Sequence, residues 1–574
     1  MGEPELVKFG SRSWVLWILL ILTLVYAPFF GHRMIRMAGD EKVYVSQAIE
    51  MAQHGNWFIQ RLQGVPDYYK GPLHYILLRI GMMVFGWNPW AVLYMNFLFL
   101  FGGAVALGAL IRRYCGGDKA NGYAVWTGAF FATCVGVYAH TFASQMEVEL
   151  AGLFAIALYV LDSTPIDAGG FLFWFLAGLI GWSKSPLHAV LAGSAALLFW
   201  LVNGELLTRL KNWKTWAAMF SGIAFCTAGY LPAYLLDREN FVNYYIIRET
   251  LSKGDSGQSW TISYQSVLGF YLFPWILIAF LTYIDFFSKV FRPWQRFFDP
   301  KQRRALSLAI CGIIPSFAFF TWHPYHFENY NLPVISGVIL FVGLTFANRL
   351  PRLETAYRVA IGLTALIVLA LPVGMTMLTQ QFAPLPAWWP SALLPTVWIA
   401  TLLSSVGLIC FGVIRKIAQP QWLALSMVGF LFSVGCTVTM IGERELFDLN
   451  QYLATSQGVN DQEIGYYNLQ HNIWSEWGLM NFWIHRNVVA LNEPAELKAA
   501  LHSGETVLVP ARQVPDFQDF VKKELPEVPL EILPWKRWLT QGKTPGGDPL
   551  WKDAWNHHDL STLEQTYLIV KKKW

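Results

Sequence analysis

Long apolar runs, separated by short polar segments, recur through most of the chain. Many runs are near the length of about 20 residues that a helix needs to cross a hydrocarbon core of roughly 30 Å. Spanning segments must be helical, because lipid cannot satisfy free backbone groups. The pattern predicts an all-α membrane domain over residues 1–442. It predicts about thirteen spans, at residues 14–30, 88–111, 122–139, 147–162, 171–183, 186–203, 214–236, 264–290, 305–321, 328–348, 357–378, 391–414 and 421–441.

A longer stretch, residues 31–87, separates the first two predicted spans and contains two shorter helical patterns. Residues 41–54 predict an amphipathic helix that stops at Gly55, because apolar positions recur on one face. Residues 73–86 are apolar but too short to span, so we expect a second helix lying in the interface. Together these helices are predicted to form a platform on the outer leaflet.

The composition changes after Gly442, and residues 443–574 are polar and mixed. Strand-like and helix-like runs alternate there, which indicates a small α/β domain with some parallel pairing. This domain has no cysteine and no glycine-rich phosphate loop, so we expect no catalytic site in it. The predicted strands are Val488–Leu491, Thr506–Val509 and Tyr567–Val570, and the predicted helices are Glu493–Ser503 and Val514–Glu524.

Composition agrees with a polytopic membrane protein, since 55% of the residues are hydrophobic and only 14% are charged. The net charge of +4 is too small and too localised to indicate nucleic-acid binding. Lys and Arg instead cluster in alternate loops, and such clusters are typical of cytoplasmic loops. This bias places the N-terminus in the cytoplasm and, with an odd number of spans, the C-terminal domain outside. The basic clusters so assigned include Arg112/Arg113, Arg209/Lys211, Arg303/Arg304, Arg349/Arg352 and Arg415/Lys416.

Acidic residues lie at the predicted outer ends of two spans. Asp40 and Glu41 follow the first span, and Glu147 and Glu149 begin the fourth inside an apolar run. One interpretation of Asp40 is a helix N-cap, because aspartate is favoured there and acids suit the first turn. The other is a functional site, because ionisable groups at membrane depth are costly and usually face a cavity or a partner.

Three cations, Lys70, Lys184 and Arg248, are predicted on the same face. Lys184 follows a short span, and interrupted spans often bind anionic groups. The alternative is that its side chain snorkels to the interface. Arg248 lies in a large outer loop. Two interpretations of it stay open, an ordinary exposed residue and a clamp that binds a phosphate. Acids and cations that meet on one aqueous face can support chemistry in which charge develops.

His323, His326 and Glu328 lie in the outer loop before the tenth predicted span and have metal-binding side chains. Their spacing matches no metal motif and Pro324 interrupts the local helix, so hydrogen bonding at the interface is the favoured interpretation. The six cysteines show no disulfide or metal spacing either. We therefore predict no metal ligands.

Taken together, these motifs resemble the bacterial lipid A aminoarabinose transferases and, more broadly, the GT-C polyprenyl-phosphate-sugar transferases that include the protein mannosyltransferases. Their order and common sidedness make the match fairly specific between residues 14 and 340. The matching segments are Asp40-Glu41, Gly55-Asn56-Trp57, Gly64-Val65-Pro66-Asp67-Tyr68-Tyr69-Lys70-Gly71-Pro72-Leu73, Met146-Glu147, Ser183-Lys184-Ser185-Pro186, Phe270–Trp275 and Tyr330-Asn331-Leu332-Pro333.

The resemblance implies a GT-C fold in which Asp40 is the central catalytic carboxylate. Glu147 would occupy the second acidic position, and the catalytic Lys70 would meet the donor phosphate together with Lys184. Tyr44, Arg248 and Tyr330 would line the pocket. The further candidate substrate-binding residues are Glu41, Tyr69, His323 and His326.

The chain departs from the family pattern at two positions. Tyr69 stands where the family has a Glu that can take part in metal binding. We therefore expect no cofactor, although the resemblance leaves a divalent metal open. Gly71 replaces the first of two prolines, so donor recognition or acceptor choice is expected to differ.

The resemblance implies a multi-pass glycosyltransferase of the bacterial inner membrane with a periplasmic C-terminal domain. It would move a sugar from a polyprenyl phosphate to lipid A or another glycolipid. Two alternatives stay open: an enzyme of the same superfamily that modifies protein or a cell-wall glycan, and a lipid-linked-sugar transporter or scaffold without transferase activity. We expect a monomer that contacts membrane lipids. We expect no binding of nucleic acid.

Overall fold

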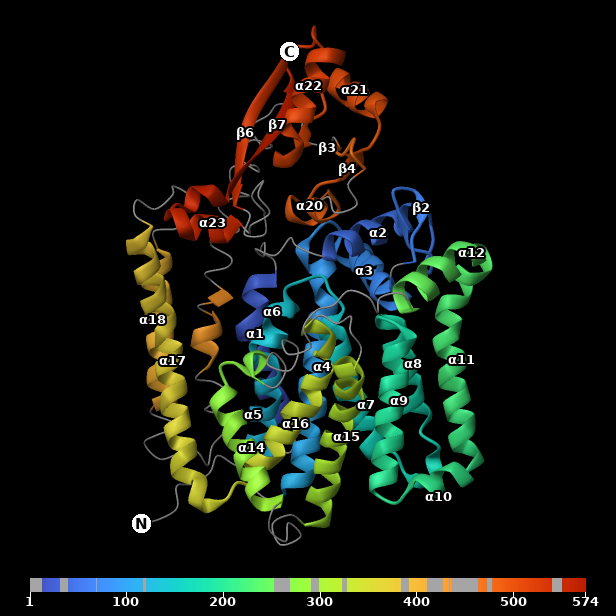
Figure 1. The fold of residues 1–574 in the computed structure, drawn as a ribbon, viewed down its shortest axis with the longest axis vertical. Coiled ribbons are helices and arrows are strands. Elements are labelled where there is room, and N and C mark those ends of the chain that lie inside the picture. Colours follow the sequence, from blue (N-terminus) through green and yellow to red (C-terminus); the bar gives the residue numbers. More distant parts are fainter. Residues whose placement is uncertain are drawn as a thin grey trace.

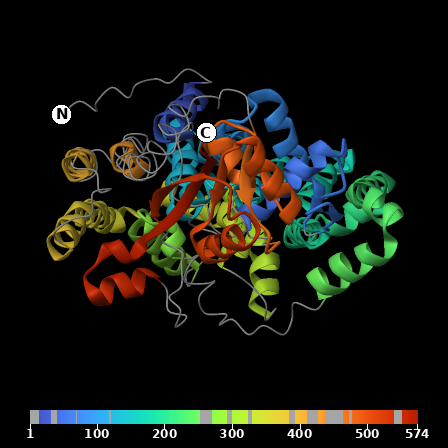
Figure 2. The same cartoon turned by 90° about the horizontal axis from the view of Figure 1, so that it is seen from above.

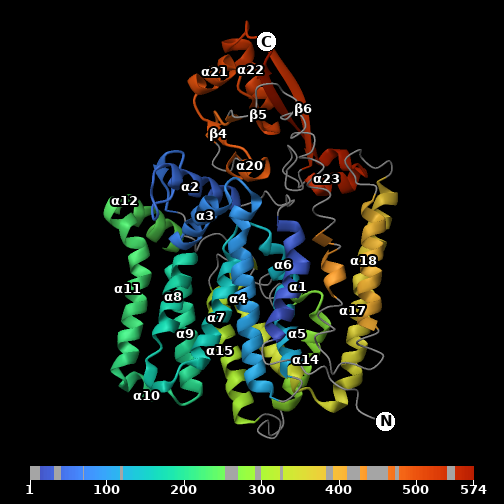
Figure 3. The ribbon, with the colours of Figure 1, turned by 180° about the vertical axis from the view of Figure 1, so that it is seen from behind.

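The helices pack along one another in a bundle, which is called the helical layer, and a small C-terminal sheet region lies over one end of that layer (Figure 1 and Figure 3). Seen from above, the sheet region covers the central helices, and α11 and α17 lie on opposite flanks (Figure 2). The end below the sheet is called the sheet end, and the end where α10 (Leu206–Lys211) lies is called the opposite end. The computed structural model describes residues 13–30, 40–68, 70–116, 120–251, 269–290, 299–322, 328–382, 392–409, 427–432, 434–435, 463–471, 477–538 and 550–573.

Four of the described helices are long and apolar enough to cross a membrane: α4 (Pro89–Cys115), α11 (Trp213–Leu236), α15 (Pro300–Trp322) and α17 (Glu354–Gln381). A fifth span results if α5 (Ala120–Thr133) and α6 (Val135–Thr141), bent by 59°, count as one. The chain is therefore a multi-pass membrane protein, as predicted. The other helices of the layer are α1 (Ser13–Phe30), α7 (Glu147–Ser163), α8 (Phe171–Ser183), α9 (Pro186–Val202), α14 (Ile276–Val290), α16 (Val334–Ala347) and α18 (Leu393–Leu408).

The predicted total of thirteen spans stays a prediction, and its last member, 421–441, lies mostly outside the described residues. Most other predicted spans match an observed helix to within a few residues. Shorter helical elements separate some of the helices. Most are single turns, namely η1 (Ile166–Ala168), α12 (Arg238–Asn240), η4 (Phe270–Leu272), η6 (Glu328–Asn331) and η7 (Pro351–Leu353), and η2 (Phe241–Leu251) is a π-helix.

Two predicted spans differ from the structure for one shared reason. The span predicted at 122–139 is broken between α5 and α6, where the amide of Val135 donates to the carbonyl oxygen of Phe273 at 2.8 Å. The helix predicted at 264–290 begins only at Ile276, because the described residues before it turn to supply that carbonyl. A long-range backbone hydrogen bond therefore replaces regular helix at both places.

The predicted platform is present at the sheet end as α2 (Glu41–Gln53) and α3 (Pro72–Phe85). α2 stops where Gly55 adopts a φ of +67°, a conformation that glycine reaches without steric cost. A short hairpin of β1 (Arg61–Leu62) and β2 (Val65–Pro66) joins the two helices. The carboxylate of Glu50 accepts from both amides of the hairpin turn, each at 2.8 Å. The hairpin is thereby fixed to α2.

The sequence predicts a platform that rests on the outer leaflet. In the structure, protein covers most of the surface of α2. α20 (Trp477–Trp483) packs on it so closely that a Cβ on Gly478 would lie 2.4 Å from the Ser46 hydroxyl oxygen. The ring of Phe482 also packs on Trp87, with 5.3 Å between centroids. One hydrophobic core therefore continues from the helical layer into the sheet region.

The C-terminal region contains a five-stranded sheet in the order β4-β3-β5-β7-β6. β3 pairs in parallel with β4 and β5, and β7 pairs antiparallel with β5 and β6, which confirms the predicted partial parallel pairing. The strands are β3 (Ile464–Tyr467), β4 (Val488–Leu491), β5 (Val507–Val509), β6 (Leu530–Trp538) and β7 (Glu564–Lys572). The helices of the region are α21 (Pro494–Ser503), α22 (Val514–Glu524) and α23 (Leu550–His557), with 3-10 turns η9 (Ala511–Gln513) and η10 (Leu560–Leu563).

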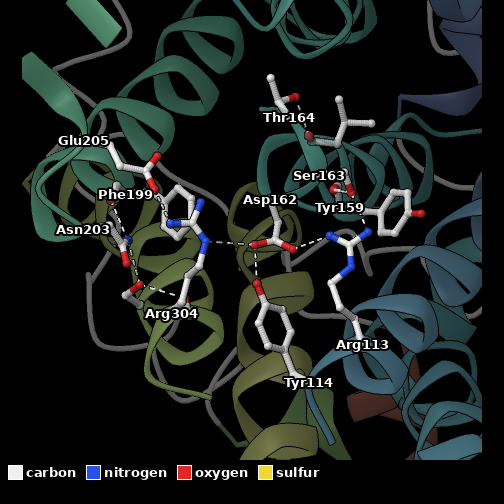
Figure 4. A network of polar contacts seen from close by, with 12 residues as sticks. Arg113, Tyr114, Tyr159, Asp162, Ser163, Thr164, Phe199, Asn203, Glu205 and Arg304 are labelled. Carbon is white, nitrogen blue, oxygen red and sulfur yellow. Dashed lines mark hydrogen bonds and ion pairs between the residues drawn. The ribbon is translucent and has the colours of Figure 1, made fainter. Parts of the chain in front are cut away.

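An ion-pair network fastens α4, α7 and α15 together at the opposite end (Figure 4). Asp162, with a side chain only 1% exposed, lies 2.6 Å from a guanidinium nitrogen of Arg113 and 3.5 Å from one of Arg304. The hydroxyl of Tyr114 also donates to Asp162. Arg304 further pairs with Glu205, which precedes α10. No sequence pattern marks Asp162, because its partners are distant along the chain.

Replacing Asp162 with asparagine is expected to lower the thermal unfolding midpoint of the purified protein. The change removes the charge that Arg113 and Arg304 share, at a cost of about 1–3 kcal/mol for lost charged hydrogen bonds. Asp167→Asn is the matched control, because Asp167 is exposed nearby. An unchanged midpoint for Asp162→Asn in detergent would show that the network does not contribute to stability.

Candidate functional site

Asp40 immediately precedes α2 at the sheet end, but its side chain makes no capping hydrogen bond. Instead, the Tyr44 hydroxyl donates to Oδ2 of Asp40 at 3.1 Å. Asp40 thus holds the N-cap position of α2, and its backbone carbonyl oxygen accepts from the Tyr44 amide at 3.0 Å, but its carboxylate does not cap the helix. The residue lies at the positive end of the α2 dipole. A tyrosine one turn along the helix holds the carboxylate in place.

Glu41 connects α2 to the start of α7. Its Oε2 accepts from the backbone amide of Ser144 at 3.0 Å, and the side chain is buried. Because Ser144 lies in the turn just before Glu147, this bond brings the Asp40 end of α2 beside the acidic end of α7. The geometry gives Glu41 a positioning role, and its predicted contact with substrate stays a prediction.

Glu147 and Lys184 form a buried ion pair between the first residue of α7 and the turn that joins α8 to α9. Their Oε1 and Nζ atoms lie 3.0 Å apart, and the side chains are only 6% and 7% exposed. The ammonium group also lies 4.2 Å from the ring centroid of Tyr330, at a distance typical of cation–π contacts. The snorkelling interpretation of Lys184 is therefore wrong, since the side chain is held inside the protein.

Lys70 joins this group through the backbone of the next residue. The amide of Gly71 donates to the carbonyl oxygen of Lys184 at 3.2 Å. Lys70 is itself buried, and the charged groups that act on the nearby His188 ring are Lys184, Glu147 and Lys70. Both lysines predicted to meet a phosphate are thus at one place, although the motifs that contain them are far apart in the sequence.

The glycine that departs from the family pattern has a structural reason. A Cβ on Gly71 would lie 2.1 Å from the carbonyl oxygen of Trp182, far inside van der Waals contact. Proline would also lack the amide that binds Lys184. The close approach of the two backbones here therefore depends on glycine.

Gly71→Ala is expected to lower both the unfolding midpoint and the rate of the reaction that the site supports. Overpacking of this kind costs about 1–3 kcal/mol, and moving Lys70 away from Lys184 should lower the rate about tenfold or more. Gly374→Ala in α17 is the control, because nothing lies within 4 Å of the added carbon. A variant with the midpoint and rate of the unmodified protein would contradict the close approach.

A second buried pair joins α3 to α7. Nδ1 of His74 lies 3.2 Å from Oε2 of Glu149, and both side chains are 0% exposed. The His74 ring packs against the edge of Tyr44 at 5.5 Å, and Tyr44 in turn binds Asp40. Sequence reasoning missed His74, and its only signal was a lone histidine within the apolar run of α3.

Aromatic side chains support the loop that contains Lys70. Tyr68 packs against Phe241 with ring centroids 5.5 Å apart, and the neighbouring Tyr230 donates to the carbonyl oxygen of Gly181 at 2.5 Å. Burial, with a smaller contribution from Asp237, raises the pKa of Tyr68 to about 12. The Tyr68 hydroxyl therefore stays protonated near neutral pH and cannot act there as a base.

Four predicted site residues are not placed by this geometry. Tyr69, His323 and His326 lie outside the described residues. Arg248 belongs to η2, but its side chain is also outside the described part. The described residues contain no group of three or more His, Cys, Asp and Glu side chains close enough to hold a metal ion. Tyr69, His323 and His326 lie outside those residues, so the absence of a metal stays a prediction, and no step below involves one.

Comparison with known proteins identifies solved structures that share this fold. No family model matches the sequence, and no curated protein matches it. Among solved structures, ArnT from Cupriavidus metallidurans bound to undecaprenyl phosphate matches with a TM-score of 0.64 and 17% identity over 98% of both chains. The apo state of the same protein matches with a TM-score of 0.63, also at 17% identity over 98% of both chains.

The arabinosyltransferase EmbB from Mycobacterium smegmatis is a weaker match, with a TM-score of 0.44 and 13% identity over 77% of this chain and 42% of EmbB. The two ArnT structures confirm the resemblance found in the motifs at the level of the fold. Over nearly its whole length, this chain has the fold of ArnT.

Proposed function

We propose that the protein is a membrane glycosyltransferase that takes its sugar from a polyprenyl phosphate. The observation that carries the proposal is the convergence of Asp40, Lys70, Glu147 and Lys184 at one end of an ArnT-like fold. The solved ArnT structure with undecaprenyl phosphate supports a polyprenyl-phosphate donor.

The reaction breaks the bond between the anomeric carbon and the phosphate oxygen and joins that carbon to an acceptor oxygen. Negative charge grows on the departing lipid phosphate, and Lys70 and Lys184 would stabilise it there. Glu147 and Tyr330 fix the direction of the Lys184 ammonium group before the donor arrives. Cations placed in advance at developing charge need no reorganisation during the reaction.

Asp40 would accept the proton of an acceptor hydroxyl as the new bond forms. General base catalysis of this kind typically contributes about 10²–10⁴-fold in rate. If the acceptor oxygen belongs to a phosphate, no proton has to leave, and the Asp40 carboxylate would stabilise the cationic sugar instead. Both roles require the ionised carboxylate that Tyr44 orients.

We further propose that the sheet end faces the periplasm of a bacterial inner membrane and that the N-terminus is cytoplasmic. Arg113, Arg209 and Arg304 gather at the opposite end of the layer, and basic residues favour the cytoplasmic side. This orientation also agrees with the thirteen predicted spans, whose odd number puts the two termini on opposite sides.

The proposed acceptor is lipid A or another envelope glycolipid, with protein and cell-wall glycan as alternatives within the same superfamily. Mass spectrometry of lipid A, envelope glycans and envelope proteins, with and without the protein, would identify the modified species. Release of polyprenyl phosphate from a polyprenyl-phosphate-linked sugar by the purified protein is the direct test. If no such release occurs while the labelled lipid crosses vesicle membranes, the protein is a transporter and the proposal fails.

A further inference from the structure

His188 lies one turn into α9 from Lys184 and was not among the expected site residues. Its ring is almost fully buried, with 4% of the residue exposed. Nδ1 lies 3.0 Å from the hydroxyl oxygen of Ser185. The other ring nitrogen, Nε2, is buried and has no hydrogen-bond partner in the described part of the chain. A buried polar atom without a partner costs free energy. The unpartnered nitrogen therefore indicates that a ligand binds beside it.

The surroundings of the ring show which chemistry that occupant should have. The charged groups acting on His188 are Lys184, Glu147 and Lys70, and Glu147 already pairs with Lys184. The ring lies 6.1 Å from Phe320, which lies 5.8 Å from the Tyr330 ring beneath Lys184. Two cations and one engaged carboxylate make this wall of the site attractive to an anionic oxygen.

The hydrogen bond to Ser185 can set the tautomer of the ring. When the Ser185 hydroxyl donates to Nδ1, a neutral imidazole carries its hydrogen on Nε2. The unpartnered nitrogen is then a donor. A donor beside two lysines complements a phosphate oxygen and would be unsuited to another cation.

We propose that Nε2–H of His188 donates a hydrogen bond to a phosphate oxygen of the polyprenyl-phosphate donor, beside Lys70 and Lys184. This inference rests on the proposed function. The two ammonium groups supply charge, and the imidazole adds a direction, because its donor is fixed by a planar ring and by Ser185. His188 is therefore assigned as a third residue that binds the phosphate.

The test is direct binding of undecaprenyl phosphate to the purified full-length protein, without turnover. His188→Asn and His188→Leu remove a donor at the Nε2 position and should weaken binding about tenfold or more. His188→Gln can place its amide nitrogen near that position and should stay within about threefold of the unmodified protein. Val190→Ala, at an exposed position of the same helix, is the matched control and should bind normally.

Undecaprenol, which has the same tail and no phosphate, separates a lost contact from a lost fold. All variants should bind undecaprenol equally if His188 acts on the phosphate, whereas a misfolded variant would lose both lipids. Unchanged undecaprenyl phosphate binding by His188→Asn and His188→Leu would overturn the inference, as would a loss in His188→Gln equal to that in His188→Leu. If the unmodified protein does not bind undecaprenyl phosphate, the proposed function itself fails.

Discussion

Asp40→Asn is expected to abolish sugar transfer, with a loss of about 10²–10⁴-fold in initial rate, and to leave the fold intact. Asparagine has nearly the shape of aspartate, and its amide oxygen can still accept from the Tyr44 hydroxyl that binds Asp40 at 3.1 Å. What disappears is the negative charge, which both a general base and a stabiliser of a cationic sugar require. The measurement is the initial rate of polyprenyl phosphate release, with the unfolding midpoint recorded in parallel.

Asp67→Asn provides a control on the same platform. Asp67 accepts from the side-chain amide of Gln47 at 2.9 Å, and an asparagine oxygen can keep that contact. Its rate should stay within a few-fold of the unmodified protein, which would show that loss of any acid at the sheet end is not enough. Normal turnover in Asp40→Asn would remove Asp40 from the mechanism.

Lys184→Met is expected to destabilise the protein strongly as well as to stop the reaction. The change leaves Glu147, with a side chain 6% exposed, as a buried carboxylate without the cation that lies 3.0 Å from it. Breaking a buried pair from one side typically costs about 3–5 kcal/mol, because an uncompensated charge stays in a medium of low polarity. Thermal unfolding in detergent measures this cost, and the release assay measures the loss of rate.

The double variant Lys184→Met with Glu147→Gln separates the two effects. Removing both charges should restore most of the unfolding midpoint, since no buried charge is left alone, while the rate stays low because a phosphate-binding cation is missing. A double variant that regains the rate would show that Lys184 has no part in the reaction. Lys498→Met breaks the exposed pair with Glu524, 2.7 Å apart, and should leave the midpoint unchanged.

Elements whose cause is local were predicted well from the sequence. α2, α3 and α22 lie within one residue of their predicted bounds, because apolar periodicity and the Gly55 stop are properties of neighbouring residues. The pairing of β3 in parallel with β4 and β5 agrees with the predicted alternation of helices and strands. The strands β3 and β6 were not predicted, since their residues lack a clear alternation.

The candidate site was predicted only as a set of motifs on one face. The sequence identified Asp40, Lys70, Glu147 and Lys184, but their pairing depends on contacts between distant segments. Asp40 holds the N-cap position, but its carboxylate binds Tyr44 and does not cap the helix, and Lys184 pairs with Glu147 and does not snorkel. Local propensity depends only on neighbouring residues, so it favours capping and snorkelling whether or not a distant partner is present. It therefore cannot predict which distant residue a side chain contacts.

By itself, the sequence determined that this is a membrane protein of apolar helices with a polar α/β region at its C-terminus. Hydrophobic length and charge bias are sums over neighbouring residues, so no coordinates are needed to read them. Only the tertiary structure decided that His74 meets Glu149, that Asp162 joins three helices and that Lys70 lies near His188 and Lys184. In each case the residues are far apart along the chain, and how the helices pack decides which of them meet.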